Sequence, residues 1–285
     1  MKKGRMTILL LTCALISTWW VVNRVIMPHV EERIAFADKI LTGQMNAFHQ
    51  YRVLKPLIAK GLQILISPWV HSARHQHILS YGFITLCTFC GIFFLFHTYL
   101  AGFFSEQVAI IGVLLLQAVI PLSVTGYFMI GDFINLIFYL LALQAFLHRR
   151  DILLPLIIAI GTMNRIQIIF VLVFYIAFLL EKGLLFQRLH IIMASVLAFV
   201  AVYIGLRLVI GFKPLPWVIA KMVARNTDPF YLVRWIIPLW LAEVAGMVIL
   251  ALMSFQKSRL FFRLSLIRTY PAIHKIWDNR SMNTH

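Results

Sequence analysis

An apolar run opens the chain: residues 6–22 read MTILLLTCALISTWWVV. Residues 28–77 then mix acids, bases and aromatic residues, after which the chain is almost continuously apolar to Phe255. Hydrophobic residues make up 61% of the chain and charged residues only 13%, and the mean hydropathy is +0.88. A soluble domain does not have this composition, so the sequence predicts an integral membrane protein with one large polar excursion.

The long apolar runs predict an all-α fold, a polytopic bundle of transmembrane helices. Backbone groups in lipid need hydrogen-bond partners within the protein. The strands of a membrane β-barrel alternate apolar and polar residues, so these continuous apolar runs favour helices. A span needs roughly 20 apolar residues, so the chain has room for about seven to nine membrane segments, including short or broken ones. One integral membrane domain is expected over 1–285, made of a first span at 6–26, an outer amphipathic segment at 28–77, the remaining spans at 78–255 and a basic cytoplasmic tail at 256–285.

Basic residues give a formal net charge of +16, but they are scattered among the apolar runs. A nucleic-acid interface needs a basic face on a soluble surface, so these residues are better explained as topology signals and contacts to membrane lipids. The clearest clusters, His148–Arg150 and Lys182–Arg188, are expected in cytoplasmic loops. The same rule places both termini in the cytoplasm of a multi-pass cell-membrane protein, with a bacterial inner membrane favoured.

Residues 152–180 carry cytoplasmic signals at both ends and are interrupted by the sequence GTMNR at 161–165. One helix of this length would span roughly 40 Å, which exceeds the hydrocarbon thickness of about 30 Å. We therefore expect two short helices, at 152–162 and 166–180, that meet near the outer leaflet. The alternative is one tilted helix with Arg165 buried between neighbouring helices. Complete spanning helices are expected at 78–100, 107–125, 132–147, 191–211 and 236–255.

The polar excursion begins with an amphipathic helix that Gly43 is placed to end. Its apolar face is formed, at helical spacing, by Val30, Ile34, Ala37 and Leu41. Glu31 and Asp38 lie seven residues apart on another face, with Glu32 beside them. These acids either act in a reaction or form the solvated side of an interfacial helix.

Several bases near this excursion are candidates for binding a phosphate. Arg52 and Lys55 either anchor the chain at the headgroup layer or hold a phosphate, which a guanidinium does through paired hydrogen bonds. The helix expected over Val53–Val70 lies on the outer leaflet. An arginine inside an apolar segment costs about 2.5–3.5 kcal/mol on insertion scales, so Arg165 and its neighbour Asn164 are functional candidates.

Arg165 has two expected partners: an anionic lipid head, or Asp132 at the outer start of its own helix. Glu243 in the last span is a weaker candidate of the same kind. The bases of the outer loop Lys213–Trp235 suggest a further contact with an anion.

No metal site is predicted, and no cofactor is expected, although a divalent cation is left open. Three nearby histidines have no carboxylate among them and lie in an expected loop, which argues against zinc: His71, His75 and His77. The cysteines all lie in apolar runs and are expected to be buried small residues: Cys13, Cys87 and Cys90.

Short motifs in the first 180 residues resemble the opening of polytopic C-type glycosyltransferases, which use polyprenyl-phosphate-linked sugars. The matching residues are Glu31 and Glu32, the run Ile34–Leu41, Gly43 and the stretch Tyr51–Leu57. The break at 161–165 is similar to segments in bacterial relatives. The chain departs from the family in having Glu-Glu where Asp is usual, and in being shorter than most members.

The resemblance implies sugar transfer at the outer face from a polyprenyl-phosphate donor. Glu31 or Glu32 is then the expected general base on the acceptor, with Asp38 as the next choice. The lipid phosphate is expected to be held by Arg52 and Arg165, with Lys55 and Asn164 beside them. A nucleotide-sugar donor would require a soluble nucleotide-binding domain, and none is predicted here.

Two other functions remain open. One is a non-catalytic membrane component of surface polysaccharide assembly. The other is a transporter or lipid flippase built around the broken segment 152–180. Transporters usually have two related halves with paired interruptions, and the absence of a second, matching interruption in this sequence argues against this function. The sugar, the acceptor and the oligomeric state are not indicated by the sequence.

Overall fold

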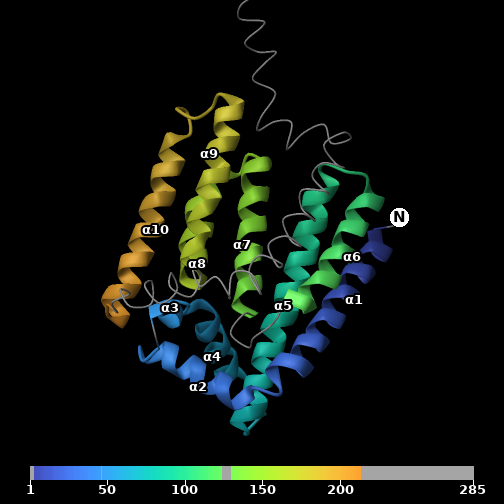
Figure 1. Cartoon of the computed structure of the whole chain (residues 1–285), viewed down its shortest axis with the longest axis vertical. Coiled ribbons are helices and arrows are strands. Elements are labelled where there is room, and N and C mark those ends of the chain that lie inside the picture. The colour runs from blue at the N-terminus through green and yellow to red at the C-terminus, as the bar shows by residue number, and fades with distance from the viewer. Residues whose placement is uncertain (1–2, 46, 124–129, 213–285) are drawn as a thin grey trace, which may run out of the picture. The chain divides into compact units, whose positions relative to one another are not determined.

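The computed structural model describes residues 3–45, 47–123 and 130–212 (Figure 1). Every regular element in these ranges is a helix and none is a strand, so the predicted all-α class is confirmed there. The predicted helix 236–255, the tail 256–285, the loop Lys213–Trp235 and Glu243 lie outside the described residues.

The chain divides into two compact units. One comprises Met1–Leu179 and Leu184–Lys213, and the other Leu180–Gly183 and Pro214–His285. Most of the second unit lies outside the described residues, so the fold described below is that of the first. The expectation of a single domain over 1–285 stays a prediction.

Ten α-helices occur in the described residues. They are α1 (Lys3–Val21), α2 (Val30–Leu41), α3 (Ala47–Gln50), α4 (Leu54–Ile66), α5 (Ala73–Ala101), α6 (Glu106–Ser123), α7 (Ile130–Leu147), α8 (Leu154–Asn164), α9 (Val171–Lys182) and α10 (Leu189–Ile210). A π-helical turn, Val22–Ile26, continues α1 to the predicted end of the first span. The predicted amphipathic helices correspond to α2 and α4, although α4 ends at Ile66 rather than Val70.

Three of these helical segments are long and apolar enough to cross a membrane: Gly4–Ile26, Ala73–Ala101 and Leu189–Ile210. Shorter apolar helices cover Glu106–Ile120, Gly131–Leu147 and Asp151–Asn164. The count of about seven to nine membrane segments therefore stays a prediction.

Two apolar clusters form the core. The first joins α1, α5, α6 and α7 around Phe89, Ile92 and Phe93, all of which are fully buried. The second joins α7 to α8, α9 and α10 around Phe146 and Tyr175. Accordingly α5 lies against α1, α6 and α7, and α8 lies between α7 and α10 (Figure 1).

The outward faces of the long helices are also apolar. Trp19 of α1 is 67% exposed and Leu208 of α10 is 70% exposed. Extended apolar exposure of this kind is rare on soluble monomers, whereas lipid tails cover it without cost. The exposed surface thus agrees with the composition in indicating a membrane environment.

The interruption predicted within 152–180 is confirmed. α8 ends at Asn164, Arg165 has an extended backbone (φ −156°, ψ 135°), and a 3-10 turn over Ile166–Phe170 leads into α9. A Cβ on Gly161 would lie 2.8 Å from the side chain of Ile168. Glycine therefore permits the close packing that this break requires.

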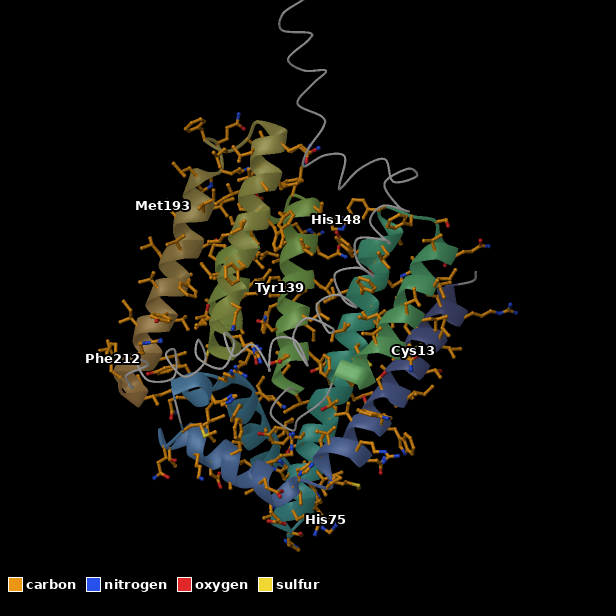
Figure 2. The ribbon with its side chains drawn as sticks, viewed as in Figure 1. Cys13, His75, Tyr139, His148, Met193 and Phe212 are labelled. Atoms are coloured by element: carbon orange, nitrogen blue, oxygen red, sulfur yellow. The ribbon has the colours of Figure 1, made fainter. Side chains whose placement is uncertain are left out.

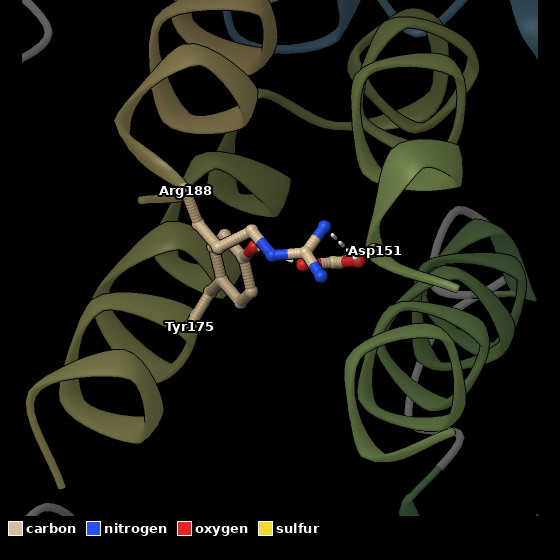
Figure 3. Close-up of polar contacts among 3 residues, drawn as sticks. All are labelled: Asp151, Tyr175 and Arg188. Atoms are coloured by element: carbon tan, nitrogen blue, oxygen red, sulfur yellow. Dashed lines mark hydrogen bonds and ion pairs between the residues drawn. The ribbon is translucent and has the colours of Figure 1, made fainter. Parts of the chain in front are cut away.

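The two short helices fold back on each other. Asp151, just before α8, accepts a hydrogen bond from the hydroxyl of Tyr175 in α9 at 2.5 Å (Figure 3). The same carboxylate lies 3.5 Å from Nη1 of Arg188, at the start of α10. A continuous helix would hold Asp151 and Tyr175 roughly 36 Å apart. The alternative of a single tilted helix is therefore wrong, and α8 and α9 form a hairpin with Arg165 at its tip.

Helix α7 runs from one end of this unit to the other. Its first turn contains Gly131, whose carbonyl accepts a hydrogen bond from Nδ2 of Asn164 at 3.0 Å. Its last turn leads to His148–Arg150, roughly 25 Å away along the helix axis. Figure 2 shows His148 beyond α7 and Phe212 beyond α10, toward opposite ends of these two helices.

Three sequence expectations need correction. Helix α2 buries Val30, Arg33 and Ile40, so its buried face is rotated from the predicted apolar face. Helix α5 begins at Ala73, which makes His75 and His77 helical rather than loop residues. Cys87 is exposed on α5 instead of buried, because it lies on a face of α5 turned away from the core, whereas Cys13 is buried as expected.

Candidate functional site

A small, partly open cavity lies where α2, α4 and α5 meet the start of α7 and the tip of the α8–α9 hairpin. We call it the cationic cavity. It is lined by Arg33, Phe36, Ile40, Arg52, Lys55, Pro56, Tyr81, Gly131, Asn164 and Arg165. Four of these side chains are cationic, and no described residue in the lining is acidic.

Two of the cations are deeply buried against one aromatic ring. Arg33 is 4% exposed and Lys55 is 8% exposed. Cζ of Arg33 and Nζ of Lys55 lie 4.7 Å and 5.0 Å from the centroid of the Tyr81 ring. The electron-rich face of an aromatic ring attracts cations. Tyr81 thus offsets part of the cost of burying these two charges.

Burial, and to a smaller extent the charge of the cavity, shifts the pKa values of titratable groups on the segment that leads into α4. Burial lowers the pKa of Lys55 well below its ordinary value, and the charge of Arg33 lowers it further. Burial also lowers the pKa of Arg52. The pKa of His49 falls to about 4, first through burial and then through the charges of Arg52 and Arg165. All three shifts disfavour the protonated form, as expected for cationic groups that are removed from water and, for Lys55 and His49, lie near other positive charges.

The hairpin tip supplies the fourth cation. Arg165 forms an ion pair with Asp132 of α7, the protein partner expected from the sequence. The neighbouring Asn164 is 2% exposed and is held by its hydrogen bond to Gly131. These contacts fix the direction of the Arg165 side chain at the edge of the cavity.

A second cavity, of about 180 Å³, adjoins the first. It is lined by Ile34, Ala37, Asp38, Leu41, Pro56, Ala59, Lys60, Gln63, Ala73, Gln76, His77 and Tyr81. Pro56 and Tyr81 line both cavities, so they form the wall between them.

The residues predicted to bind a phosphate all meet in the cationic cavity: Arg52, Lys55, Asn164 and Arg165. The predicted acids do not meet there. Glu31 and Glu32 are exposed in the first turn of α2 and line neither cavity, whereas Asp38 lines the second. No group of three or more His, Cys, Asp or Glu side chains suited to a metal ion occurs among residues 3–45, 47–123 and 130–212.

Sequence reasoning missed Arg33 and Tyr81, and considered His77 only as a metal ligand. Arg33 had a detectable signal, because it follows Val30 by three residues and therefore shares a helix face with a buried apolar residue. Tyr81 lies within the long apolar run of α5, where nothing local distinguishes it from a core residue.

The chain matches no family model, no curated protein and no solved structure. The chemistry of the two cavities therefore has to be argued from their residues.

Proposed function

We propose that this protein is a membrane glycosyltransferase that binds the phosphate of a polyprenyl-phosphate-linked sugar in the cationic cavity and transfers the sugar at the outer face. The observation that carries the proposal is the convergence of Arg33, Arg52, Lys55 and Arg165 on one cavity. These residues come from three segments that are far apart in the sequence. The motif resemblance to C-type glycosyltransferases supplies the reaction class.

The electrostatics of the cavity support an anionic ligand. Burying several like charges together is costly, and a bound phosphate would remove that cost while accepting hydrogen bonds from the guanidinium groups. In sugar transfer, the phosphate oxygen gains charge as the glycosidic bond breaks. Cations placed around that oxygen would therefore stabilise the transition state more than the bound donor.

The arrangement of the helices supports an outward-facing site. Arg188 lies beside Asp151, and His148–Arg150 follows α7, so basic residues gather at the end of the unit opposite Gly131 and the cavity. Loops rich in Lys and Arg stay in the cytoplasm. With α1, α5, α6, α7, α10 and the re-entrant α8–α9 hairpin in the membrane, the cavity would face outward, within reach of a lipid phosphate.

Binding of a polyprenyl phosphate to the full-length protein in detergent tests the proposal. Arg52→Gln and Arg165→Gln are each expected to weaken binding about tenfold, the equivalent of about 1.4 kcal/mol, as measured by titration calorimetry. The matched control is Arg24→Gln, because Arg24 is an exposed arginine of the π-helical turn outside both cavities. Equal affinities for the wild type and both cavity variants would contradict the proposal.

One observation favours a second candidate function. Because Glu31 and Glu32 line neither cavity, a protein that binds a lipid-linked sugar without transferring it would also fit. Such a protein would be a non-catalytic component of polysaccharide assembly or a lipid flippase. Incubation with a labelled hexosyl-phosphoryl polyprenol and membrane acceptors separates these functions, because only a transferase releases free polyprenyl phosphate.

A further inference from the structure

Arg207, in the last turn of α10, is a buried arginine that lines neither cavity. An arginine near the end of a spanning helix ordinarily extends its charged group toward the headgroups and water. Arg207 does not, because it is only 8% exposed. Among the residues that the structure describes, no carboxylate pairs with it. The cost of burying this charge is therefore offset by contacts of another kind.

Two tyrosine rings make these contacts. Cζ of Arg207 lies 3.5 Å from the ring centroid of Tyr203, one helical turn earlier in α10, and 4.2 Å from that of Tyr51. Nη1 of Arg207 also donates to the carbonyl of Tyr203 at 3.3 Å. The attraction between a cation and an aromatic face is strongest where water is excluded. One of the two rings comes from a distant part of the chain, so the charge joins α10 to the segment that precedes α4.

Further contacts hold that segment at the end of α10 (Figure 1). The hydroxyl of Tyr51 donates to the carbonyl of Gly211 at 3.0 Å. A Cβ on Gly43 would lie 3.3 Å from the carbonyl oxygen of Ile210, so the turn after α2 also lies close against α10. Gly43 has a positive φ of 75°, which glycine adopts without strain. The chain is thus fixed on both sides of α3 by the end of α10.

This attachment bears directly on the cationic cavity. Arg52, which lines the cavity, is the residue after Tyr51. Helix α10 packs most extensively against α8, whose end leads to Arg165. It therefore contacts both parts of the chain that carry these two guanidinium groups. The charges of both groups lower the pKa of His49, so they act in one region and repel each other. Like charges stay together only where the surrounding packing holds them.

We infer that Arg207 is a positioning residue of the cationic cavity: by binding the ring of Tyr51, it holds Arg52 near Arg165 in the arrangement that takes up a phosphate. This inference rests on the proposed function. Arg207 does not contact the ligand, because it does not line the cavity. The ligand meets two guanidinium groups that are already in place, and it loses less of its binding free energy in ordering them.

Binding of polyprenyl phosphate to the full-length protein in detergent, followed by titration calorimetry, tests the inference. Arg207→Gln removes the cation and is expected to weaken binding about tenfold. Arg207→Lys keeps a cation at the rings, so its affinity should stay within about threefold of the wild type. The matched control is Arg24→Gln, which removes an exposed arginine outside both cavities and should leave the affinity unchanged.

A double-mutant cycle separates positioning from a general structural role. If Arg207 acts through Arg52, Arg207→Gln should have no further effect on affinity in the Arg52→Gln background. It should keep its full effect in the Lys55→Met background, because Lys55 is placed by its own contact with Tyr81. Wild-type affinity in Arg207→Gln, or the same loss in both backgrounds, would overturn the inference.

Tyr51→Phe tests the same contact if Arg207→Gln does not fold. It removes the hydrogen bond to Gly211 and keeps the ring. Affinity should fall about threefold in the otherwise wild-type protein and not at all beside Arg52→Gln. An unchanged affinity, or the same loss in both backgrounds, would contradict the inference while wild-type binding upholds the proposed function. A wild-type protein that does not bind polyprenyl phosphate overturns the proposed function, and this inference with it.

Discussion

Buried charge occurs at both ends of the α8–α9 hairpin, but it is arranged differently. At the base, the carboxylate of Asp151 is 6% exposed, accepts a hydrogen bond from Tyr175 and lies beside Arg188. At the tip, Arg165 lines a cavity with three further cations and no acid in its described lining. At the base the carboxylate is paired with a hydroxyl and a guanidinium of the protein, whereas at the tip four cations line one cavity beside the ion pair of Arg165 with Asp132, which favours an anionic ligand.

This comparison predicts that removing a charge has opposite effects at the two sites. At the base, loss of the carboxylate should destabilise the fold and leave ligand binding unchanged. At Lys55 in the cationic cavity, loss of the charge should stabilise the fold and weaken ligand binding. Three measurements test the contrast.

The largest effect is expected at Asp151. Asp151→Asn should lower the free energy of unfolding by about 2–3 kcal/mol, because Tyr175 and Arg188 lose a charged acceptor in a buried site. Unfolding in detergent measures the change, and the affinity for polyprenyl phosphate should stay the same. Tyr175→Phe is the milder companion, with an expected loss of about 1 kcal/mol. A large loss of phosphate affinity in Asp151→Asn would end the distinction between the two sites.

The next largest effect is expected at Lys55. Burial lowers the pKa of Lys55 well below its ordinary value, and the charge of Arg33 lowers it further. Lys55→Met keeps most of the side-chain volume and removes a charge that the folded state disfavours. It should raise the free energy of unfolding by about 1 kcal/mol and weaken binding of polyprenyl phosphate about tenfold. Both changes can be measured on one purified sample. A variant that is less stable than the wild type would show that the cavity is balanced without a ligand.

The smallest effect is expected in the pH dependence of stability. The pKa of His49 falls from 6.5 to about 4 in the folded protein. The unfolded chain therefore binds more protons between these values, so this residue makes stability fall as the pH is lowered from 6.5 toward 4. His49→Gln should reduce the drop in unfolding temperature between about pH 7 and about pH 5. An unchanged drop would mean that neither burial nor the charges of Arg52 and Arg165 lower the pKa of His49.

Much of the helical organisation could be predicted locally. Apolar runs of spanning length predicted α1, α5 and α10, and Gly43, with a positive φ of 75°, follows α2 where the sequence placed its end. The break before Arg165 was also predictable, because a polar residue inside an apolar run conflicts with a continuous lipid-facing helix. Arg165 was found for the same reason, because a guanidinium in such a segment needs a partner wherever the chain folds. Arg52 was found from its place beside Lys55 in the polar excursion, where a guanidinium can hold a phosphate.

Local patterns could not decide which groups face one another. The apolar spacing along α2 did not indicate that Arg33 and Ile40 are buried, since their burial depends on α4 and α5, which pack against this helix. The choice among Glu31, Glu32 and Asp38 was open for the same reason. All three lie on one short helix, and only the surrounding helices separate them.

The sequence by itself determined that this protein is helical, that it is built for a membrane, and that one of its apolar segments is broken at Arg165. These properties follow from composition, from run length and from the cost of a charge in lipid, all of which act within a short stretch of chain. Only the tertiary structure brought residues 33, 55, 81 and 165 to one cavity and placed Asp38 in the next. Such a convergence depends on how helices distant in the sequence pack together, and no local pattern encodes that.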